Sequence, residues 1–89
     1  MNKFTDGTVR WVVDSGHGWL RVPMESAAGL EFSEFSYVDP AGRLLYLEED
    51  CDAGVWLKHH GVSGRDFPAD VVNGSSAIRN LPRVVPAVR

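Results

Sequence analysis

The fold is decided by residues 32–48, whose sequence is Phe32-Ser33-Glu34-Phe35-Ser36-Tyr37-Val38-Asp39-Pro40-Ala41-Gly42-Arg43-Leu44-Leu45-Tyr46-Leu47-Glu48. Residues 32–38 alternate in part between apolar and polar side chains, which is typical of a strand. Residues 39–42 carry a turn signal, because proline presets the first central φ and glycine closes the turn. Residues 43–48 then predict the returning strand, so we expect a β-hairpin here.

A second hairpin is predicted on the N-terminal side. Residues 8–14 are rich in β-branched and aromatic side chains, which favour a strand. We expect a turn at 15–18, where two glycines can take positive φ, and an antiparallel strand over 19–22 that Pro23 ends. Residues 23–29 predict a helix of one to two turns, since proline begins the segment and glycine ends it.

Past the central hairpin the sequence predicts one more helix, over residues 52–60. Either Asp50 or Asp52 can serve as its N-cap, because a short carboxylate accepts hydrogen bonds from free backbone amides. Gly61 can supply the left-handed residue that stops it.

Residues 61–76 have the composition of a loop, and residues 77–81 predict an edge strand. The expected order is therefore β-β-α-β-β-α, an α+β fold with a small, mainly antiparallel sheet and one or two short helices. Residues 1–81 are expected to form a single domain, followed by an extended basic C-terminal tail over 82–89. Removing residues 83–89 is expected to leave the thermal midpoint nearly unchanged.

Length and composition limit the class of protein. A chain of 89 residues, 44% apolar and with nine aromatic side chains, is one small ordered domain. No apolar run reaches the roughly 18 residues that span a bilayer, and the N-terminus lacks the apolar stretch of a signal peptide. The lone Cys51 excludes an internal disulfide and a cysteine-based zinc site. We expect a cytoplasmic protein without a membrane partner.

Charge is concentrated in the middle of the chain. The whole chain has a net charge of −3, whereas residues 25–52 hold eight acidic residues and one arginine, a balance of −7. Such a segment repels phosphates and attracts basic surfaces, which argues against direct nucleic-acid binding. It is equally typical of a solvated face that keeps a small protein soluble.

The turn Gly16-His17-Gly18-Trp19 is the first motif that could carry chemistry. Two glycines let the backbone turn tightly beside the imidazole, so that His17 could act as a base, a ligand or a contact residue. The alternative is a hairpin turn in which His17 is incidental. The Gly-x-Gly pattern precedes a strand rather than a helix, so it is no dinucleotide fingerprint.

The second motif is Leu47-Glu48-Glu49-Asp50-Cys51-Asp52-Ala53, with four carboxylates at a strand–helix junction. It could be an acidic docking surface, a divalent cation site or a set of helix-capping groups. The spacing of the oxygen ligands and glycine of a calcium loop is not present. We expect no bound metal and no cofactor.

The remaining reactive and aromatic side chains predict structural roles. Cys51 is expected to be buried and inert. His59 and His60 lack the i, i+4 spacing of a helical zinc pair, point apart and decorate the last helical turn. Five aromatic residues are expected in the core, and any of them found exposed would be a contact anchor; they are Trp11, Trp19, Trp56, Phe35 and Tyr46.

Three segments of the chain together resemble a group of small proteins of bacteriophages, plasmids and other mobile elements. The segments are Asp14-Ser15-Gly16-His17-Gly18-Trp19-Leu20-Arg21-Val22-Pro23, Phe35-Ser36-Tyr37 and Tyr46-Leu47-Glu48-Glu49-Asp50-Cys51-Asp52-Ala53. The group supplies no activity to carry over. The resemblance implies a bacterial cytosol and a mobile-element origin. Small acidic proteins of that origin are similar in size and mode of action to anti-CRISPR and other counter-defence inhibitors, which commonly act by binding.

Two functions from different classes follow. The first is a binding inhibitor, not an enzyme, whose acidic face docks on a basic surface of a host nucleic-acid-handling or CRISPR-type complex. Its candidate partner-binding residues are Glu31, Glu34, Glu48, Glu49, Asp50, Asp52 and His17. The alternative is a small metal- or thiol-dependent enzyme that uses His17 with the Glu48–Asp52 cluster. A third reading, nucleic-acid binding, is open only to the tail arginines Arg79, Arg83 and Arg89.

Overall fold

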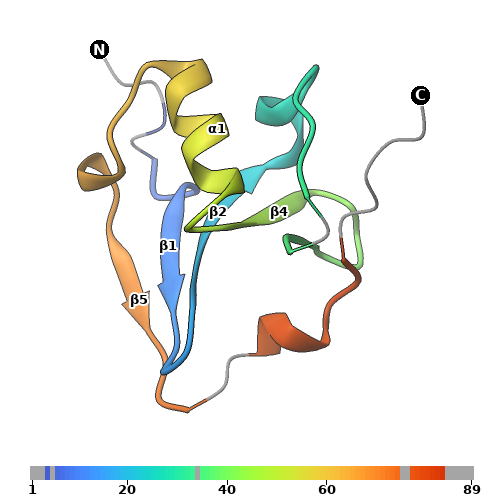
Figure 1. Cartoon of the computed structure of the whole chain (residues 1–89), viewed down its shortest axis with the longest axis vertical. Coiled ribbons are helices and arrows are strands. Elements are labelled where there is room, and N and C mark those ends of the chain that lie inside the picture. The colour runs from blue at the N-terminus through green and yellow to red at the C-terminus, as the bar shows by residue number, and fades with distance from the viewer. Residues whose placement is uncertain (1–3, 5, 34, 75–76, 84–89) are drawn as a thin grey trace.

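A computed structural model describes residues 4, 6–33, 35–74 and 77–83 (Figure 1). Within these residues the fold consists of one α-helix, a five-stranded sheet and three short 3-10 helices. The elements in chain order are β1 Arg10–Val13, β2 Gly18–Pro23, η1 Met24–Ala27, β3 Tyr37–Val38, β4 Leu44–Glu48, α1 Asp52–His60, η2 Gly64–Asp66, β5 Ala69–Val71 and η3 Ala77–Asn80.

The sheet has the strand order β3-β4-β2-β1-β5. Three of its four pairings are antiparallel, and only β5 runs parallel to its neighbour β1. In the register of β2 with β4, Trp19 lies opposite Glu48 and Leu20 lies opposite Leu47. The chain is therefore an α+β protein with a mainly antiparallel sheet, as the sequence predicts.

The face of the sheet that α1 covers holds the larger core cluster. Because successive strand residues point to opposite faces, Leu20 and Val22 of β2 and Leu47 of β4 share this face. Trp56 of α1 packs against the cluster with none of its surface exposed. In Figure 1, α1 crosses in front of β2. Burial of these apolar side chains is what attaches the helix to the sheet.

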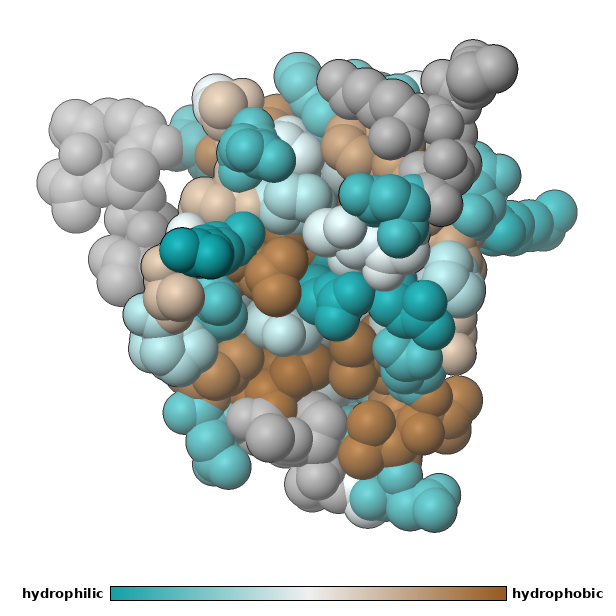
Figure 2. Space-filling view, turned by 180° about the vertical axis from the view of Figure 1, so that it is seen from behind, coloured by the Kyte–Doolittle hydropathy of each residue, from teal (hydrophilic) through white to brown (hydrophobic). Residues whose placement is uncertain are grey.

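A smaller cluster lies on the opposite face. It joins Trp19 of β2 and Tyr37 of β3 to Ile78 of η3, with Val12 and Tyr46 packed beside them. Figure 2 shows the molecule from this side, with hydrophobic residues gathered mainly in the lower half of the view. Both faces of the sheet therefore carry apolar side chains.

Both predicted strand pairs, β1 with β2 and β3 with β4, are present, and so is the predicted helix. In the turn after β3, the Asp39 carboxylate accepts hydrogen bonds from the backbone N–H of Arg43 and Leu44, and Gly42 has a φ of 70°. Helix α1 spans the predicted residues 52–60 and ends at Gly61, whose φ is 65°. Local chemistry is enough to set the 39–42 turn and the C-terminal end of α1, because each lies at a residue with a special conformation or hydrogen bond.

The predicted strand over residues 32–38 is wrong for most of its length, because β3 contains only its last two residues. The reason is a side-chain network. Ser33 and Ser36 both donate hydrogen bonds to the carboxylate of Asp52, which lies at the start of α1. These bonds draw the segment toward the helix and out of the strand ladder.

The predicted helix over residues 23–29 is also corrected. It is the 3-10 helix η1, which covers only residues 24–27, and the chain then turns at Gly29 with a φ of 82°. The Ser26 hydroxyl donates to the carbonyl of Pro23 at 2.6 Å, a local bond that closes this short turn.

The predicted loop over residues 61–76 contains a strand that the sequence did not reveal. Strand β5 pairs with β1 through hydrogen bonds from Trp11 N to Pro68 O at 2.8 Å and from Val72 N to Val13 O at 2.7 Å. All three β5 residues are exposed, and three residues are too few for an alternating pattern to mark a strand. A parallel pairing with a strand nearly 60 residues earlier cannot be inferred from local sequence.

The predicted edge strand over residues 77–81 is wrong, because residues 77–80 form the 3-10 helix η3. The next two described residues instead contact β3: Val38 N donates to Pro82 O at 2.8 Å, and Arg83 forms an isolated bridge with Tyr37. The Arg83 guanidinium also lies 5.2 Å from the centre of the Tyr37 ring. Residues 84–89 of the predicted tail lie outside the described residues.

Candidate functional site: an acidic hollow

The two sequence motifs meet at one surface hollow of about 380 Å³. We call it the acidic hollow and define it by its lining residues, His17, Trp19, Phe35, Glu48, Asp50 and Cys51. Its walls are mostly apolar, whereas the two carboxylates bring negative charge. A volume of this size is at the lower end of the range of small-molecule sites, roughly 300 to 1,000 Å³. It can hold one or a few side chains of a partner.

His17 is presented by a turn that Asp14 organises. The Asp14 carboxylate accepts hydrogen bonds from the backbone N–H of Gly16 and of His17, both at 2.9 Å, and Asp14 N donates to the His17 carbonyl. Asp14 is buried, so this turn is fixed from inside the molecule. The expectation that the two glycines of the motif take positive φ is wrong. The Asp14 side chain, rather than glycine, makes the turn.

Gly18 joins the two motifs. It begins β2, and its carbonyl accepts a hydrogen bond from the backbone N–H of Glu49 at 3.1 Å. A Cβ added at Gly18 would lie 3.0 Å from the Glu49 carboxylate, so any larger residue would displace that acid. The glycine is thus explained by the close approach of an acidic side chain.

Phe35 is the large aromatic residue that the structure leaves on the surface. It was expected in the core, but 57% of it is exposed. Trp19 and Trp56 are buried as predicted, and Trp11 and Tyr46 are partly buried against core clusters. The sequence analysis treats any of these five aromatic residues that is exposed as a contact anchor, so Phe35 is the candidate anchor.

A buried carboxylate holds the segment that carries Phe35. Asp52 is only 3% exposed and accepts hydrogen bonds from the Ser33 backbone N–H at 3.0 Å, from the Ser33 hydroxyl at 2.8 Å and from the Ser36 hydroxyl. The Ser36 hydroxyl in turn accepts from Glu48 N at 3.0 Å. One network therefore ties the Phe35 segment to β4 and α1 beside the acidic hollow.

Some of the predicted partner-binding residues lie at the acidic hollow and others lie elsewhere. Glu48 and Asp50 line the acidic hollow with His17, and Glu49 is exposed over Gly18. Glu48 is held in place because one of its carboxylate oxygens accepts the Asp50 backbone N–H at 2.8 Å.

The other predicted acids lie elsewhere. Asp52 is buried in its network, so it cannot belong to an exposed docking surface. Glu31 is exposed but does not line the hollow, and Glu34 lies outside the described residues. The predicted capping role is also wrong for both aspartates. The N-cap position of α1 is Cys51, without a side-chain capping bond.

Cys51 is exposed in the acidic hollow, contrary to the expectation that it is buried. The negative charge of Asp52, followed by partial desolvation and the charge of Glu48, raises the pKa of its thiol above the usual 9.0. Because the thiolate is the reactive form, this shift lowers the fraction of Cys51 that is ready to act as a nucleophile.

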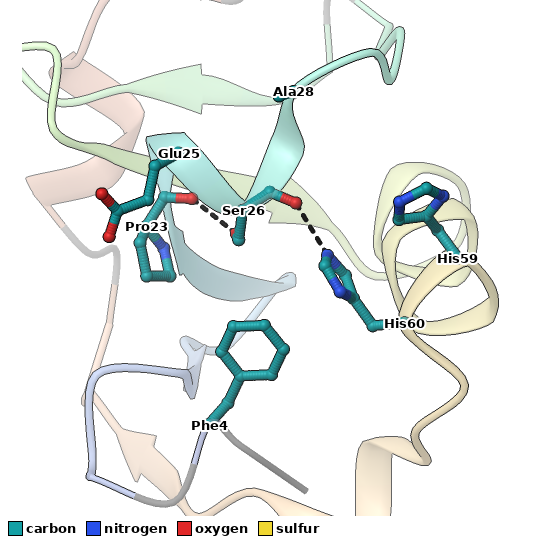
Figure 3. A pocket seen from close by; sticks show the side chains of 7 residues that line it. All are labelled: Phe4, Pro23, Glu25, Ser26, Ala28, His59 and His60. Atoms are coloured by element: carbon teal, nitrogen blue, oxygen red, sulfur yellow. Dashed lines mark hydrogen bonds between the residues drawn. The ribbon is translucent and has the colours of Figure 1, made fainter.

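A second hollow, of about 400 Å³, lies at the other end of α1 (Figure 3). Hydrogen bonds tie its lining residues Ser26 and His60 to each other and to the buried Trp56. His60 Nε2 and the Ser26 carbonyl are hydrogen-bonded at 2.7 Å, and Trp56 Nε1 donates to the Ser26 hydroxyl at 2.9 Å. The His60 ring packs between Phe4 and Trp56, with centroid distances of 4.9 and 4.4 Å.

This arrangement corrects the sequence interpretation of the histidine pair. His60 is a partly buried link between η1 and α1 rather than a surface decoration. The two imidazoles do not point apart, because their ring centroids are 4.9 Å from each other. The second hollow is therefore bordered by packing and hydrogen bonds that hold the fold, and the acidic hollow is the better candidate for function.

Comparison of the chain with protein-family models, with curated proteins and with solved structures finds no match. No helix among the described residues is long and apolar enough to cross a membrane. Within that same part of the chain, no cluster of three or more His, Cys, Asp or Glu side chains could hold a metal ion. The functional argument therefore depends on the geometry of the acidic hollow.

Sequence reasoning placed His17, Glu48 and Asp50 among the candidates but missed three further lining residues. The sequence predicts Trp19 and Phe35 in the core and Cys51 buried. Trp19 is buried as predicted and also lines the hollow, whereas Phe35 and Cys51 are exposed. The spacing of Phe35 from Phe32 is a signal for its exposure. Side chains three positions apart in a strand point to opposite faces, so both rings could not be buried on one face. Of these two phenylalanines, Phe32 is the buried one.

Proposed function

We propose that this protein acts by binding, and that the acidic hollow docks on a basic surface of a protein that handles nucleic acid. One observation carries the proposal: two separate motifs and an exposed Phe35 meet around one hollow with apolar walls and two carboxylates. Binding hot spots are typically aromatic anchors near the centre of an interface, and charges at the rim steer association and set register. The acidic hollow combines these two features.

The class of partner follows from the sign of the charge. Carboxylates at Glu48, Glu49 and Asp50 can take the place of phosphates on a surface that normally contacts nucleic acid. A partner covered in this way would be inhibited. The resemblance to small proteins of mobile elements favours a bacterial complex, and a CRISPR-type effector is one member of the proposed class.

The alternative of a thiol enzyme has one observation in its favour, because His17 and Cys51 line the same hollow. The raised pKa of Cys51 opposes it, since the neighbouring charge of Asp52 keeps the thiol protonated. Binding is thus the function that the acidic hollow supports best.

A defined probe tests the proposal before any natural partner is known. Hexalysine is titrated into the labelled protein at low salt, and backbone and Trp indole resonances are followed by NMR. We expect shifts at His17, Trp19 and Asp50 that weaken at high salt, because salt screens exposed charges. Asp50→Lys should weaken binding several-fold.

Glu25→Lys is the matched control. It changes the net charge by the same amount at an exposed residue of η1, beyond the far end of β2. The six residues of β2 separate the two sites by roughly 16 Å, since a strand rises about 3.3 Å per residue. Equal weakening by both substitutions would show that only net charge matters and would refute the proposed site.

A further inference from the structure

The acidic hollow has a wall composition that selects among cationic side chains. Phe35 is 57% exposed beside it, and Trp19 and His17 contribute two more rings, whose centroids are 5.9 Å apart. The carboxylates Glu48 and Asp50 line the same space. The occupant must therefore be apolar along its length and positively charged at its tip.

Three kinds of occupant are disfavoured by this chemistry. A wholly apolar side chain would bring carboxylates into a drier environment without a partner, which costs free energy. An anion would be repelled by Glu48 and Asp50. A hard metal cation needs a shell of oxygen ligands, whereas this hollow offers two carboxylates and is otherwise lined by three rings and a thiol.

Arginine and lysine both have an apolar stem and a charged tip, but they differ in what the tip can do. The planar guanidinium stacks on aromatic rings, is more weakly hydrated than an ammonium, and donates two parallel hydrogen bonds to a carboxylate. Here an exposed phenyl ring and carboxylates are available together. Cation–π contact is another source of attraction, and arginine uses it more often than lysine.

We propose that the acidic hollow is an arginine-binding site: it takes one arginine side chain of the partner, with the guanidinium against Phe35 and within reach of the carboxylates of Glu48 and Asp50. This inference rests on the proposed function and goes beyond it by naming the side chain that the partner inserts. The buried network of Asp52 with Ser33 and Ser36 preorganises the segment that carries the phenyl ring.

Calorimetric titration of the full chain with hexa-arginine and with hexalysine, which carry the same charge, tests the inference. The wild type should bind hexa-arginine about fivefold more tightly or better. Phe35→Ala should reduce this preference to about twofold or less while leaving hexalysine affinity nearly unchanged, because only the stacking surface is lost. Asp50→Lys should weaken both peptides, and Glu25→Lys should weaken neither by more than about twofold.

The outcomes separate the two proposals. If both peptides bind equally and Asp50→Lys weakens both, the arginine inference fails while the docking proposal stands. The inference also fails if the arginine preference persists in Phe35→Ala, because the preference then arises elsewhere. If neither peptide responds to Asp50→Lys, both proposals fail. A urea unfolding curve for each variant shows that it is folded, and Phe35→Leu provides a second truncation of the aromatic surface.

Discussion

Replacing Asp52 should damage the fold far more than replacing any other acid of its cluster. Its carboxylate is 3% exposed and accepts hydrogen bonds from two serines, one of which, Ser36, is fully buried. Asp52→Ala removes the acceptor and leaves these donors behind. Three donors lose their acceptor: the Ser33 backbone N–H and the hydroxyls of Ser33 and Ser36. A buried donor without a partner costs about 1–3 kcal/mol, and about 1 kcal/mol for each of the three, because Ser33 is only partly buried, lowers the free energy of unfolding by about 3 kcal/mol.

That loss is a large fraction of the roughly 5–15 kcal/mol that stabilises a small domain. It corresponds to an increase of roughly a hundredfold in the unfolded fraction. The assay is urea denaturation at neutral pH followed by tryptophan fluorescence, with the slope of the transition compared between variants. Asp50→Ala is the matched control, since Asp50 is exposed and should change the free energy of unfolding by less than about 0.5 kcal/mol.

A more conservative substitution keeps the test decisive if Asp52→Ala does not fold. Asn at position 52 retains one acceptor oxygen but turns an N–H group toward the serine donors, so Asp52→Asn should fall between the wild type and the alanine variant. If Asp52→Ala were as stable as Asp50→Ala, the network could not be what holds Ser33 and Ser36 against α1.

The remaining predictions concern backbone fit, pH and the C-terminus. A Cβ at Gly64 would lie 2.9 Å from the Trp11 ring, so Gly64→Ala should cost about 1–3 kcal/mol, whereas Gly54→Ala in the open part of α1 should stabilise by about 0.5–1 kcal/mol; urea unfolding of the two variants checks the contrast. The Arg10 guanidinium lies 2.7 Å from the Asp70 carboxylate and lowers the pKa of that carboxyl below its usual 3.8. The contribution of this ion pair to stability is therefore present above about pH 4 and is lost as the pH falls through the lowered pKa. The stability difference between wild type and Asp70→Asn should accordingly shrink between pH 7 and pH 2.5, and a difference that grows on acidification would contradict this. A chain ending at Leu81 should melt measurably below one ending at Arg83, because it loses the backbone bond from Val38 and the cation on the Tyr37 ring; equal midpoints would show that these contacts add nothing. Because Arg83 takes part in these contacts, removal of residues 83–89 should also lower the midpoint, in contrast to the expectation from the sequence.

The parts of the fold that local chemistry determines could be predicted from the sequence. The 39–42 turn follows from an aspartate, a proline and a glycine at set positions, and α1 ends where Gly61 adopts a left-handed conformation. The turn signals that precede β2 and β4 were sufficient to assign the residues after them to returning strands.

The parts that depend on distant contacts could not be predicted. Strand β5 forms because its backbone pairs with β1, and nothing within residues 69–71 indicates that pairing. Asp52 has the local signature of a helix cap, but its carboxylate instead accepts from Ser33 and Ser36, 19 and 16 positions earlier. The same distant contact explains why Phe35 is exposed rather than buried in a strand.

For the candidate site, the sequence indicated the two motifs but not that they lie together in space. The register of β2 with β4 brings Trp19 opposite Glu48, and this pairing places His17 and the acids around one hollow. Charge counting alone assigned Asp52 to the docking surface, because a sequence does not distinguish a solvated carboxylate from a buried one that hydroxyl groups satisfy.

The most direct test of the central claim is an intermolecular NOE experiment on the full chain saturated with hexa-arginine. Phe35 and Phe4 are reporters from the two hollows, since Phe35 lines the acidic hollow and Phe4 lines the one at the other end of α1. If the acidic hollow is the binding site, the ring protons of Phe35 show NOEs to the arginine side-chain methylene protons and those of Phe4 show none. NOEs to Phe4 alone, or a saturated complex without NOEs to Phe35, would contradict the claim.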